Sequence, residues 1–375
     1  MKSSVSIATR TPTRTATAFA SLGLAVVLAL AGCSGDGTTF GNTNGAPTTG
    51  VYVIQNSPAP ASGSIAKVTS TSAASGTILQ FSTSASGASS PVSTIANLNV
   101  TSLAYLAVDA TGNIYTTATE GTTGSSVLEF PVNSSNNAQP TRGIPFNATT
   151  QITAPNALAV DAAGDLALPE ANSGVAIFSS TANGSVAPSD YITAGGASTL
   201  VNPTAAAVDT NDNLYIVNSG EGVANPIVVF NTTSTGAPTR SIGGALTTLT
   251  AGSPQGIATD SAGNLYVANV NVATGVSSIL IFEPTATGNT PPLRDITGSN
   301  TLLGCVGGIA LDNAGYLYVV SVPTCSTTAN PTVLKFSTTG DGNIAPVATF
   351  TSPTWTNADP TLSIAVYGAT PPSAQ

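Results

Sequence analysis

The sequence predicts an all-β fold, a six-bladed β-propeller with four-stranded blades, in which the C-terminal strand completes the N-terminal blade and so closes the ring. Three observations predict it. A unit of about 50 residues recurs along the chain, and this period is typical of propellers and solenoids. Each complete unit contains four short strand-like segments separated by turn residues. The first unit lacks its first segment, whereas the C-terminus ends in an unpaired segment of that kind.

The first strand of each unit is a run of small apolar residues that ends in Asp. It occurs at 106–109, 158–161, 206–209, 257–260 and 309–312. An Ala stands two residues before each Asp, at Ala107, Ala159, Ala207, Ala258 and Ala310. Small side chains suit strands that crowd around a central axis. We therefore expect this strand to be the innermost of each blade.

A tight turn follows each Asp. Its glycine positions are Gly112, Gly164, Gly263 and Gly315, and Asp212 takes this position in one unit. Gly adopts a positive φ freely and Asp tolerates it, while the leading carboxylate can accept backbone N–H groups. We interpret the recurring Asp as a hairpin residue in preference to a functional ring of carboxylates.

The remaining strands carry one marker residue each. The second strand has Tyr at positions 52, 115, 215, 266 and 318, with Ala167 as the exception. The third ends in Phe, and six such residues indicate six blades: Phe81, Phe130, Phe178, Phe230, Phe282 and Phe336. The fourth starts at a Pro that stands four residues before Ile or Phe, as in 91–95 and 346–350. Pro there protects an exposed edge without the loss of a ladder hydrogen bond.

Ring closure is predicted from the two ends of the repeat region. Residues 51–54 form the second strand of the first unit, and residues 363–367, with Ala365, supply its missing first strand. The closed ring leaves no unpaired inner edge. Trp355, between the last unit and the closing strand, is expected to pack under this junction rather than to serve as a sugar platform.

Residues 254–269, Pro-Gln-Gly-Ile-Ala-Thr-Asp-Ser-Ala-Gly-Asn-Leu-Tyr-Val-Ala-Asn, closely resemble a blade of the NHL-repeat propellers. The resemblance extends over residues 51–368 and implies the six-bladed fold. It implies no particular activity, because propellers of this kind serve many functions.

The N-terminus is typical of an exported bacterial lipoprotein. Lys2, Arg10 and Arg14 precede the apolar run 22–30, which is too short to span a membrane as a mature helix. The segment 30–33, Leu-Ala-Gly-Cys, resembles a lipobox, which implies that residues 1–32 are a signal peptide and that Cys33 carries the lipid, including palmitate. By the same resemblance Ser34 indicates the outer membrane. The alternative is a soluble secreted protein with an ordinary cleavage site.

The segments that flank the propeller are short. Residues 33–50 have the composition of a flexible tether, and residues 369–375 form a C-terminal tail. Acyl chains on Cys33 would hold the domain in the cell envelope by this tether.

Composition restricts the partners. Only 7% of the residues are charged, against about 25% in an average domain, and the net charge is −9. A protein without a basic patch is a poor partner for nucleic acid. We expect a monomer that interacts with the membrane through its lipid alone.

The chain contains no His, the commonest general base and metal ligand. Resemblance to the His-dependent enzymes known on similar propellers is thereby excluded. Cys305 and Cys325 lie on either side of one hairpin, and in an exported chain they predict a disulfide. The alternative, a metal-binding or nucleophilic thiol, lacks a partner residue.

Polar residues stand three positions after the marker of the second strand. Glu170, Asn218 and Asn269 would lie on adjacent blades and could form an oxygen cage for Ca²⁺. Gln55 and Ser321 occupy the same position in other blades, and Glu120 and Glu221 lie in neighbouring loops, all at one mouth of the channel. The gluconolactonase-like propellers bind a divalent cation in a comparable place. The competing interpretation is that short polar residues merely end the strands.

Two functions from different classes remain open. The first is a lipid-anchored binding or scaffold module, without catalysis or cofactor, for a protein or glycan. The second is a cation-dependent lactonase or hydrolase of the envelope, carried by Glu170 with Asn218 and Asn269. A structural spacer of the envelope is a third possibility.

Overall fold

The computed structural model describes residues 49–56, 76–96, 100–120, 124–170, 174–196, 199–219, 224–231, 236–249, 254–271, 276–323, 330–353, 355 and 363–368. All of them belong to one structural unit, Gly45–Gln375. The predicted signal peptide and Cys33 lie outside the described residues. Within the described part, no helix has the length and apolar character that a membrane crossing requires.

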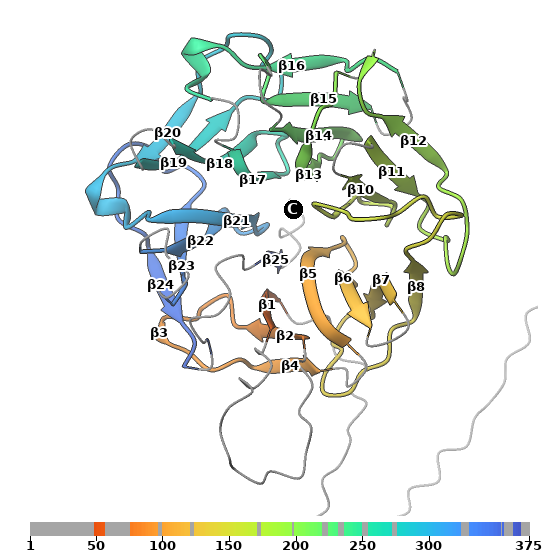
Figure 1. Ribbon diagram of the computed structural model, residues 1–375. Coiled ribbons are helices and arrows are strands. Elements are labelled where there is room, and N and C mark those ends of the chain that lie inside the picture. Colours follow the sequence, from red (N-terminus) through yellow and green to blue (C-terminus); the bar gives the residue numbers. More distant parts are fainter. Residues whose placement is uncertain are drawn as a thin grey trace, which may run out of the picture. The chain divides into compact units, whose positions relative to one another are not determined.

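Six sheets stand as blades around a central axis (Figure 1), which confirms the predicted fold class. Blade 1 contains β25 (Ile364–Tyr367), β1 (Gly50–Asn56), β2 (Gly76–Phe81) and β4 (Ser93–Ala96), and blade 2 contains β5 (Val100–Val108), β6 (Ile114–Glu120), β7 (Gly124–Phe130) and β8 (Arg142–Pro145). Blade 3 contains β9 (Ala159–Val160), β10 (Leu166–Glu170), β11 (Gly174–Phe178) and β12 (Asp190–Thr193).

The other three blades repeat this order from the axis outward. Blade 4 contains β13 (Pro203–Val208), β14 (Asn213–Asn218), β15 (Ile227–Asn231) and β16 (Arg240–Ile242), and blade 5 contains β17 (Pro254–Thr259), β18 (Leu265–Asn271), β19 (Val276–Phe282) and β20 (Arg294–Thr297). Blade 6 contains β21 (Cys305–Leu311), β22 (Tyr316–Val322), β23 (Thr332–Ser337) and β24 (Ala348–Thr351). Two single-turn 3₁₀ helices, η2 (Ala245–Thr247) and η3 (Ser299–Thr301), lie in connections between blades.

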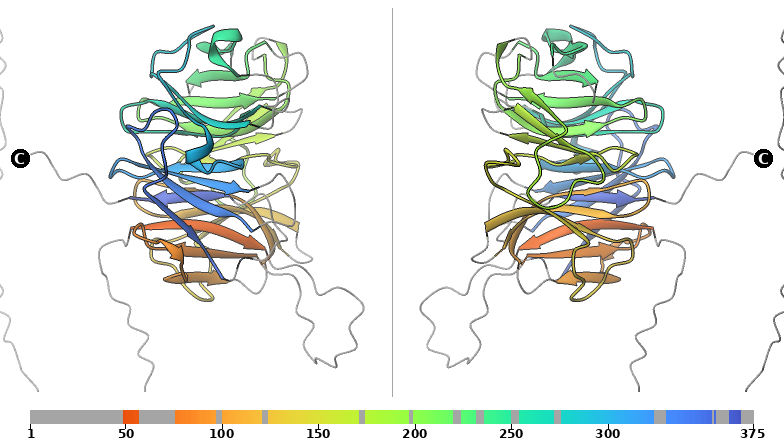
Figure 2. Two further views of the ribbon diagram at one scale, coloured as in Figure 1. Left: turned by 90° about the vertical axis from the view of Figure 1, so that its left-hand side faces the viewer. Right: turned by 90° about the vertical axis from the view of Figure 1, so that its right-hand side faces the viewer.

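The C-terminal strand closes the ring as predicted. β25 pairs antiparallel with β1, from Gly50 opposite Tyr367 to Val53 opposite Ile364. The side views in Figure 2 show that the strands of each blade run between the two faces of this unit, so that the connections lie on those faces. Because β1 starts where β25 ends, the described chain begins and ends on one face, which also carries the aspartate turns.

The core consists of the interfaces between blades. The six marker Phe side chains are fully buried, as predicted. Trp355 is buried against Phe81 and Phe350, with ring centroids 5.6 Å and 6.2 Å away. The tryptophan therefore packs at the junction of blades 1 and 6, as the sequence predicts.

The fourth strand differs slightly from the prediction. It begins two residues after each marker Pro, at Ser93 after Pro91 and at Ala348 after Pro346 in the blades at the closure. The residue after Pro makes the first contact, since Val92 N–H donates to the Gln80 carbonyl at 2.7 Å. Pro thus precedes the strand rather than starting it.

The outer edges of blades 1, 4, 5 and 6 are covered by a contact that the sequence analysis did not predict. Gly288, in the turn before the fourth strand of blade 5, donates to the Ser241 carbonyl of blade 4 at 2.6 Å and accepts from Gly243 N–H at 3.0 Å. The same parallel contact recurs at Ile95–Asn136 and Ile296–Gly342, and as the short strand β3 (Gly87–Ala88) beside β24. Pro is therefore not the sole protection of the outer edge.

Candidate functional site

The aspartate turns are built by the Asp carboxylates themselves. In blade 4, Oδ1 of Asp209 accepts the backbone N–H groups of Asn211 and Asn213, both at 2.9 Å. Its Oδ2 accepts Asn213 Nδ2 at 2.8 Å and the Tyr215 hydroxyl at 3.2 Å. Asp212 has the expected positive φ, 59°. The carboxylate is thus occupied by its own hairpin, which supports the structural interpretation of the repeated Asp.

A row of paired residues crosses each blade beside this turn, and we call it the tyrosine row. In blade 4, Ala207 pairs with Tyr215, Tyr215 with Val229, and Val229 with Arg240. The small Ala leaves room for the Tyr ring. Arg240 Nη2 donates to the Tyr215 hydroxyl at 2.6 Å, and its guanidinium lies 5.4 Å from the ring centroid.

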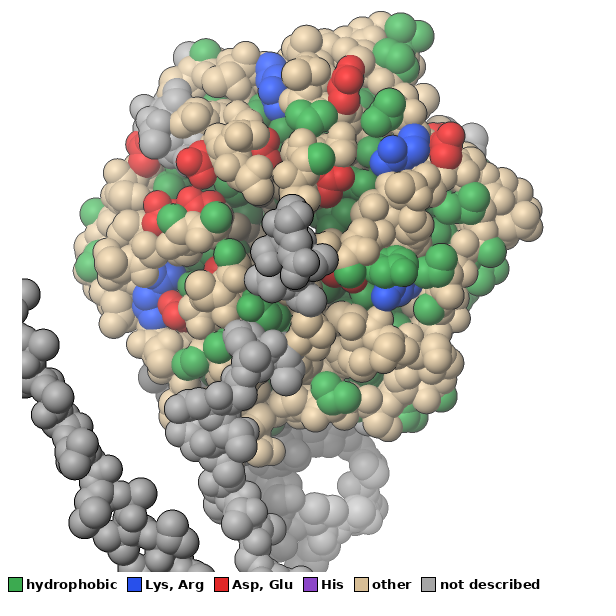
Figure 3. All heavy atoms as spheres, turned by 180° about the vertical axis from the view of Figure 1, so that it is seen from behind, with side chains coloured by type: hydrophobic (Ala, Val, Ile, Leu, Met, Phe, Trp, Pro, Cys, Tyr) green, Lys and Arg blue, Asp and Glu red, His purple; other side chains and the backbone are tan. Residues whose placement is uncertain are grey.

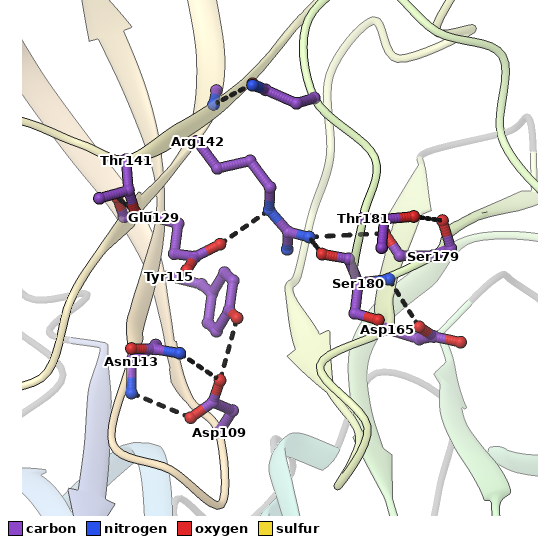
Figure 4. Close-up of polar contacts among 12 residues, drawn as sticks. Asp109, Asn113, Tyr115, Glu129, Thr141, Arg142, Asp165, Ser179, Ser180 and Thr181 are labelled. Atoms are coloured by element: carbon purple, nitrogen blue, oxygen red, sulfur yellow. Dashed lines mark hydrogen bonds and ion pairs between the residues drawn. The ribbon is translucent and has the colours of Figure 1, made fainter. Parts of the chain in front are cut away.

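Cations recur in this row, and in blades 2, 5 and 6 they tie the blade to the next one. In blade 2, Arg142 lies over Tyr115, forms an ion pair with Glu129 at 2.8 Å and donates to the Ser180 carbonyl of blade 3 (Figure 4). Equivalent bonds run from Arg294 to the Thr338 carbonyl at 2.7 Å and from Lys335 to the Thr83 carbonyl at 2.9 Å. The sequence reasoning missed these links. The signal was present, because each Arg stands two residues after a marker Pro.

The tyrosines of this row are held in the neutral form. Burial raises the pKa of Tyr215 to about 12, and the Asp209 carboxylate adds to the effect while Arg240 opposes it. Burial and then Asp260 raise the pKa of Tyr266 to about 12. A hydroxyl of this kind is a hydrogen-bond donor at neutral pH rather than a base.

Among the described residues, charge is distributed unequally between the two mouths of the channel. The four cations of the described part, Arg142, Arg240, Arg294 and Lys335, all lie in the tyrosine rows. Figure 3 shows the face with the aspartate turns, where basic side chains appear beside acidic ones at several places and acidic side chains gather without a basic one at the upper left. At the opposite mouth the described residues include only Glu120 and Glu170 as charged groups.

The polar residues at the ends of the second strands lie at that opposite mouth, but their side chains are buried. Glu170 is 1% exposed, and both carboxylate oxygens accept Thr153 N–H at 3.0 Å, with Thr153 Oγ1 donating to Oε2 at 2.8 Å. Asn218 Oδ1 accepts Val201 N–H at 2.8 Å, and Nδ2 donates to the Thr199 carbonyl at 3.0 Å. Each side chain therefore anchors the connection that leads into its own blade.

Ser321 repeats this arrangement, since its Oγ accepts Gly304 N–H at 2.8 Å and donates to the Leu302 carbonyl at 3.4 Å. In Asn269, Nδ2 donates to Ser278 Oγ at 3.5 Å, and the buried Oδ1 has no hydrogen-bond partner among the described residues. Gln55 and Glu120 lie half-buried in β1 and β6. Glu221 lies outside the described residues.

These contacts occupy most of the oxygens that the predicted cation cage would need. The side-chain oxygens of Glu170 and Asn218 accept hydrogen bonds from the connections that lead into their own blades. Of the three side chains, only Asn269 has an oxygen, Oδ1, without a hydrogen-bond partner among the described residues. Over the part of the chain that is described, no group of three or more Asp, Glu, Cys or His side chains is placed to hold a metal ion. The arrangement favours the structural interpretation of these side chains. Ca²⁺ binding stays a prediction that calorimetry can test.

Only one of the two cysteines of the predicted disulfide lies among the described residues. Cys305, the first residue of β21, is disulfide-bonded. Cys325 lies outside the described residues, so its pairing with Cys305 stays a prediction.

Comparison with known proteins found structural likenesses of low similarity only. No family model matches the chain, and no curated protein matches it. It is similar to Kuenenia stuttgartiensis hydrazine synthase, with 14% identity and a TM-score of 0.42 over 62% of each chain. It is similar to U3-55K, with 13% identity and a TM-score of 0.43 over 66% of this chain and 63% of that one. The WD40 repeats of RRP9 give 13% identity and a TM-score of 0.42 over 66% of this chain and 62% of that one.

This chain spans less than two thirds of each of these structures, and TM-scores below 0.5 carry no argument about function. Its own six blades define the class of protein, a six-bladed β-propeller.

Proposed function

We propose that this chain is a lipid-anchored, NHL-type propeller that binds a protein partner in the bacterial envelope and performs no catalysis. The single observation that carries the binding role is the composition of the mouth opposite the aspartate turns. The described residues of that mouth are poor in charge, and aliphatic side chains are exposed among them.

The exposed side chains lie on the connections of consecutive blades. Leu246 in η2 is 58% exposed and Leu302 after η3 is 59% exposed, and Val201 before β13 and Val276 at the start of β19 are exposed at the same mouth. We call these four residues the aliphatic rim. Burial of such side chains against a partner is favourable, and neighbouring exposed apolar groups mark protein-interaction sites more often than isolated ones do.

The backbone under the rim supports this role. Leu302 has a left-handed backbone with φ of 60°, and its carbonyl accepts the hydrogen bond from Ser321. A left-handed conformation is uncommon for a residue such as Leu. The blade thus holds a large apolar side chain in solvent at a position that a small polar residue would occupy with less cost.

The remaining parts of the proposal rest on the sequence. Segment 30–33 supports lipid attachment at Cys33, and the repeated Asp-x-x-Gly turn with its following Tyr supports the NHL type. The alternative, a cation-dependent hydrolase, has no observation in its favour among the described contacts, because Glu170 is already fully occupied.

The experiment is proximity cross-linking of the membrane-anchored full chain in its native envelope, with wild type and two variants compared in parallel. Leu246→Asp with Leu302→Asp introduces charge on the rim. Leu293→Asp is the matched control, because Leu293 is 55% exposed but stands before β20 on the other face. We expect at least one protein to be cross-linked by wild type and the control and to be lost from the rim variant. Equal cross-linking by all three chains would contradict the proposal.

A further inference from the structure

Blade 3 departs from the tyrosine row at every polar position. Its row reads Ala159, Ala167, Ile177 and Asp190, where blade 4 has Ala, Tyr, Val and Arg. Ala167 therefore replaces the aromatic ring, and Asp190 replaces the cation. Asp165 also replaces the Asn that donates to the turn carboxylate in blade 4.

These replacements leave a cavity of about 280 Å³ on the face with the aspartate turns. Its lining combines four apolar residues with four polar or acidic ones: Leu166, Ala167, Ile177 and Val208, with Asp161, Asp165, Asp190 and Ser189. Ser189 is exposed, so the cavity opens to solvent. Two small residues, Ala159 and Ala167, face each other where the other blades pair Ala with Tyr.

The turn carboxylate of blade 3 lacks the partners that its counterparts have. Asp161 Oδ1 accepts Ala163 N–H at 2.9 Å and Asp165 N–H at 2.8 Å. Its Oδ2 accepts no hydrogen bond from any described residue, whereas the same atom of Asp209 accepts from an amide and from the Tyr215 hydroxyl.

The other two carboxylates are also without a cation. Asp165 accepts Ser180 N–H at 2.6 Å and Asp190 accepts Tyr191 N–H at 2.9 Å. Within the described ranges, the one ion pair is Arg142 with Glu129, in blade 2. Burial raises the pKa of Asp161, and the carboxylates of Asp165 and Asp212 raise it further, so that a cation here would relieve repulsion.

We propose that the blade 3 cavity binds the guanidinium group of an arginine side chain on a protein or peptide partner. The other blades support this choice of ligand, because blades 2, 4 and 5 fill the equivalent part of the row with a Tyr ring and an Arg of the same chain. The apolar lining suits the arginine stem, and the planar guanidinium can donate to two carboxylates at once. A bare divalent cation fits less well, because its ligands must converge and half of the lining is apolar. The site lies on the opposite mouth from the aliphatic rim and does not depend on it.

The test is titration of the full chain with N-acetyl-arginine-N-methylamide, followed by calorimetry and by chemical shifts of the blade 3 amides. The matched probe is the citrulline analogue, which has the same shape without the charge. We expect a dissociation constant of about 1 mM or tighter for the arginine probe and at least about tenfold weaker binding of citrulline. Equal binding of the two probes, or no binding of either at about 10 mM, would overturn the proposal.

Variants separate this site from general attraction to an acidic face. Asp190→Asn and Asp161→Asn should each weaken arginine binding about tenfold, which is the loss of one charge-assisted bond. Glu283→Gln should not weaken it, because Glu283 is exposed on the same face outside the cavity. The double variant Ala167→Tyr with Asp190→Arg rebuilds the row of blade 4 and should abolish binding. If that variant fails to fold, the two Asn variants still decide, and unchanged affinity in both would refute the site.

Discussion

The closing strand offers the sharpest test of how this fold is held together. Ile364 is 5% exposed in β25 and packs in the cluster that contains Val51, Val53 and Trp355. The perturbation is Ile364→Ala, which removes buried carbons at the point where the two ends of the chain meet. Because a closed ring has no free inner edge, a weakened closure should affect the whole propeller rather than one blade.

The expected size follows from the burial of the side chain. Truncation of a buried Ile to Ala costs about 2–5 kcal/mol. For a domain of this length a loss of 1 kcal/mol lowers Tm by about 2 °C, so we expect a decrease of about 4–10 °C. Removal of residues 362–368 should cost more, since it also removes the buried Ala365 and leaves β1 without its inner neighbour.

The assay is thermal unfolding observed by two probes. The chain has one Trp, and Trp355 lies at the closure, so its fluorescence reports on that junction while far-UV circular dichroism reports on all blades. The control is Val347→Ala, 60% exposed, which should change stability by no more than about 0.5 kcal/mol. An unchanged Tm in Ile364→Ala, or a fluorescence transition that separates from the dichroism transition, would refute the reasoning.

Three further predictions concern other parts of the molecule. Asp209→Ala removes four hydrogen bonds and should lower the free energy of unfolding by about 2–4 kcal/mol. Asp161→Ala removes two and should lower it by about half as much, both measured by chemical denaturation. Equal losses in the two variants would contradict the assigned contacts. The pKa of Tyr215 and of Tyr266 in the folded protein is about 12, which exceeds the unfolded value near 10. The stability that these hydroxyls contribute is therefore complete below about pH 10 and is lost as the pH rises through about 12, so Tm measured from pH 8 to 12 should decline in that window. A Tm that stays constant through the window would argue against burial of these hydroxyls. Cys33→Ser should move the chain from the membrane fraction to the soluble fraction of an exporting bacterial host, and retention in the membrane would exclude lipid anchoring through this residue.

Some parts of the site could be predicted from the sequence because they repeat. Every blade needs the same turn, so the Asp and the Gly of that turn recur at a fixed interval and stand out without an alignment. The closing strand was predictable for the same reason, since the incomplete first unit and the segment with Ala365 complement each other. Trp355 could be placed because it lies between these two ends.

Other parts could not be predicted because they depend on which atoms meet. Glu170 looked like a cation ligand by its position, but the connection into its own blade brings Thr153 N–H and Oγ1 onto both carboxylate oxygens. The link from Arg142 to the Ser180 carbonyl joins two blades, and a single repeat does not show which turn of the next blade comes close.

The sequence by itself determined the number of blades, the order of their strands, the turn chemistry and the way the ring closes, because these follow from local patterns that repeat along the chain. Only the tertiary structure decided what the exceptions mean. Ala167 and Asp190 are substitutions in a pattern when the sequence is considered alone. The register across β9, β10, β11 and β12 brings them into one row beside Asp161, and their small size and charge there create an open acidic cavity.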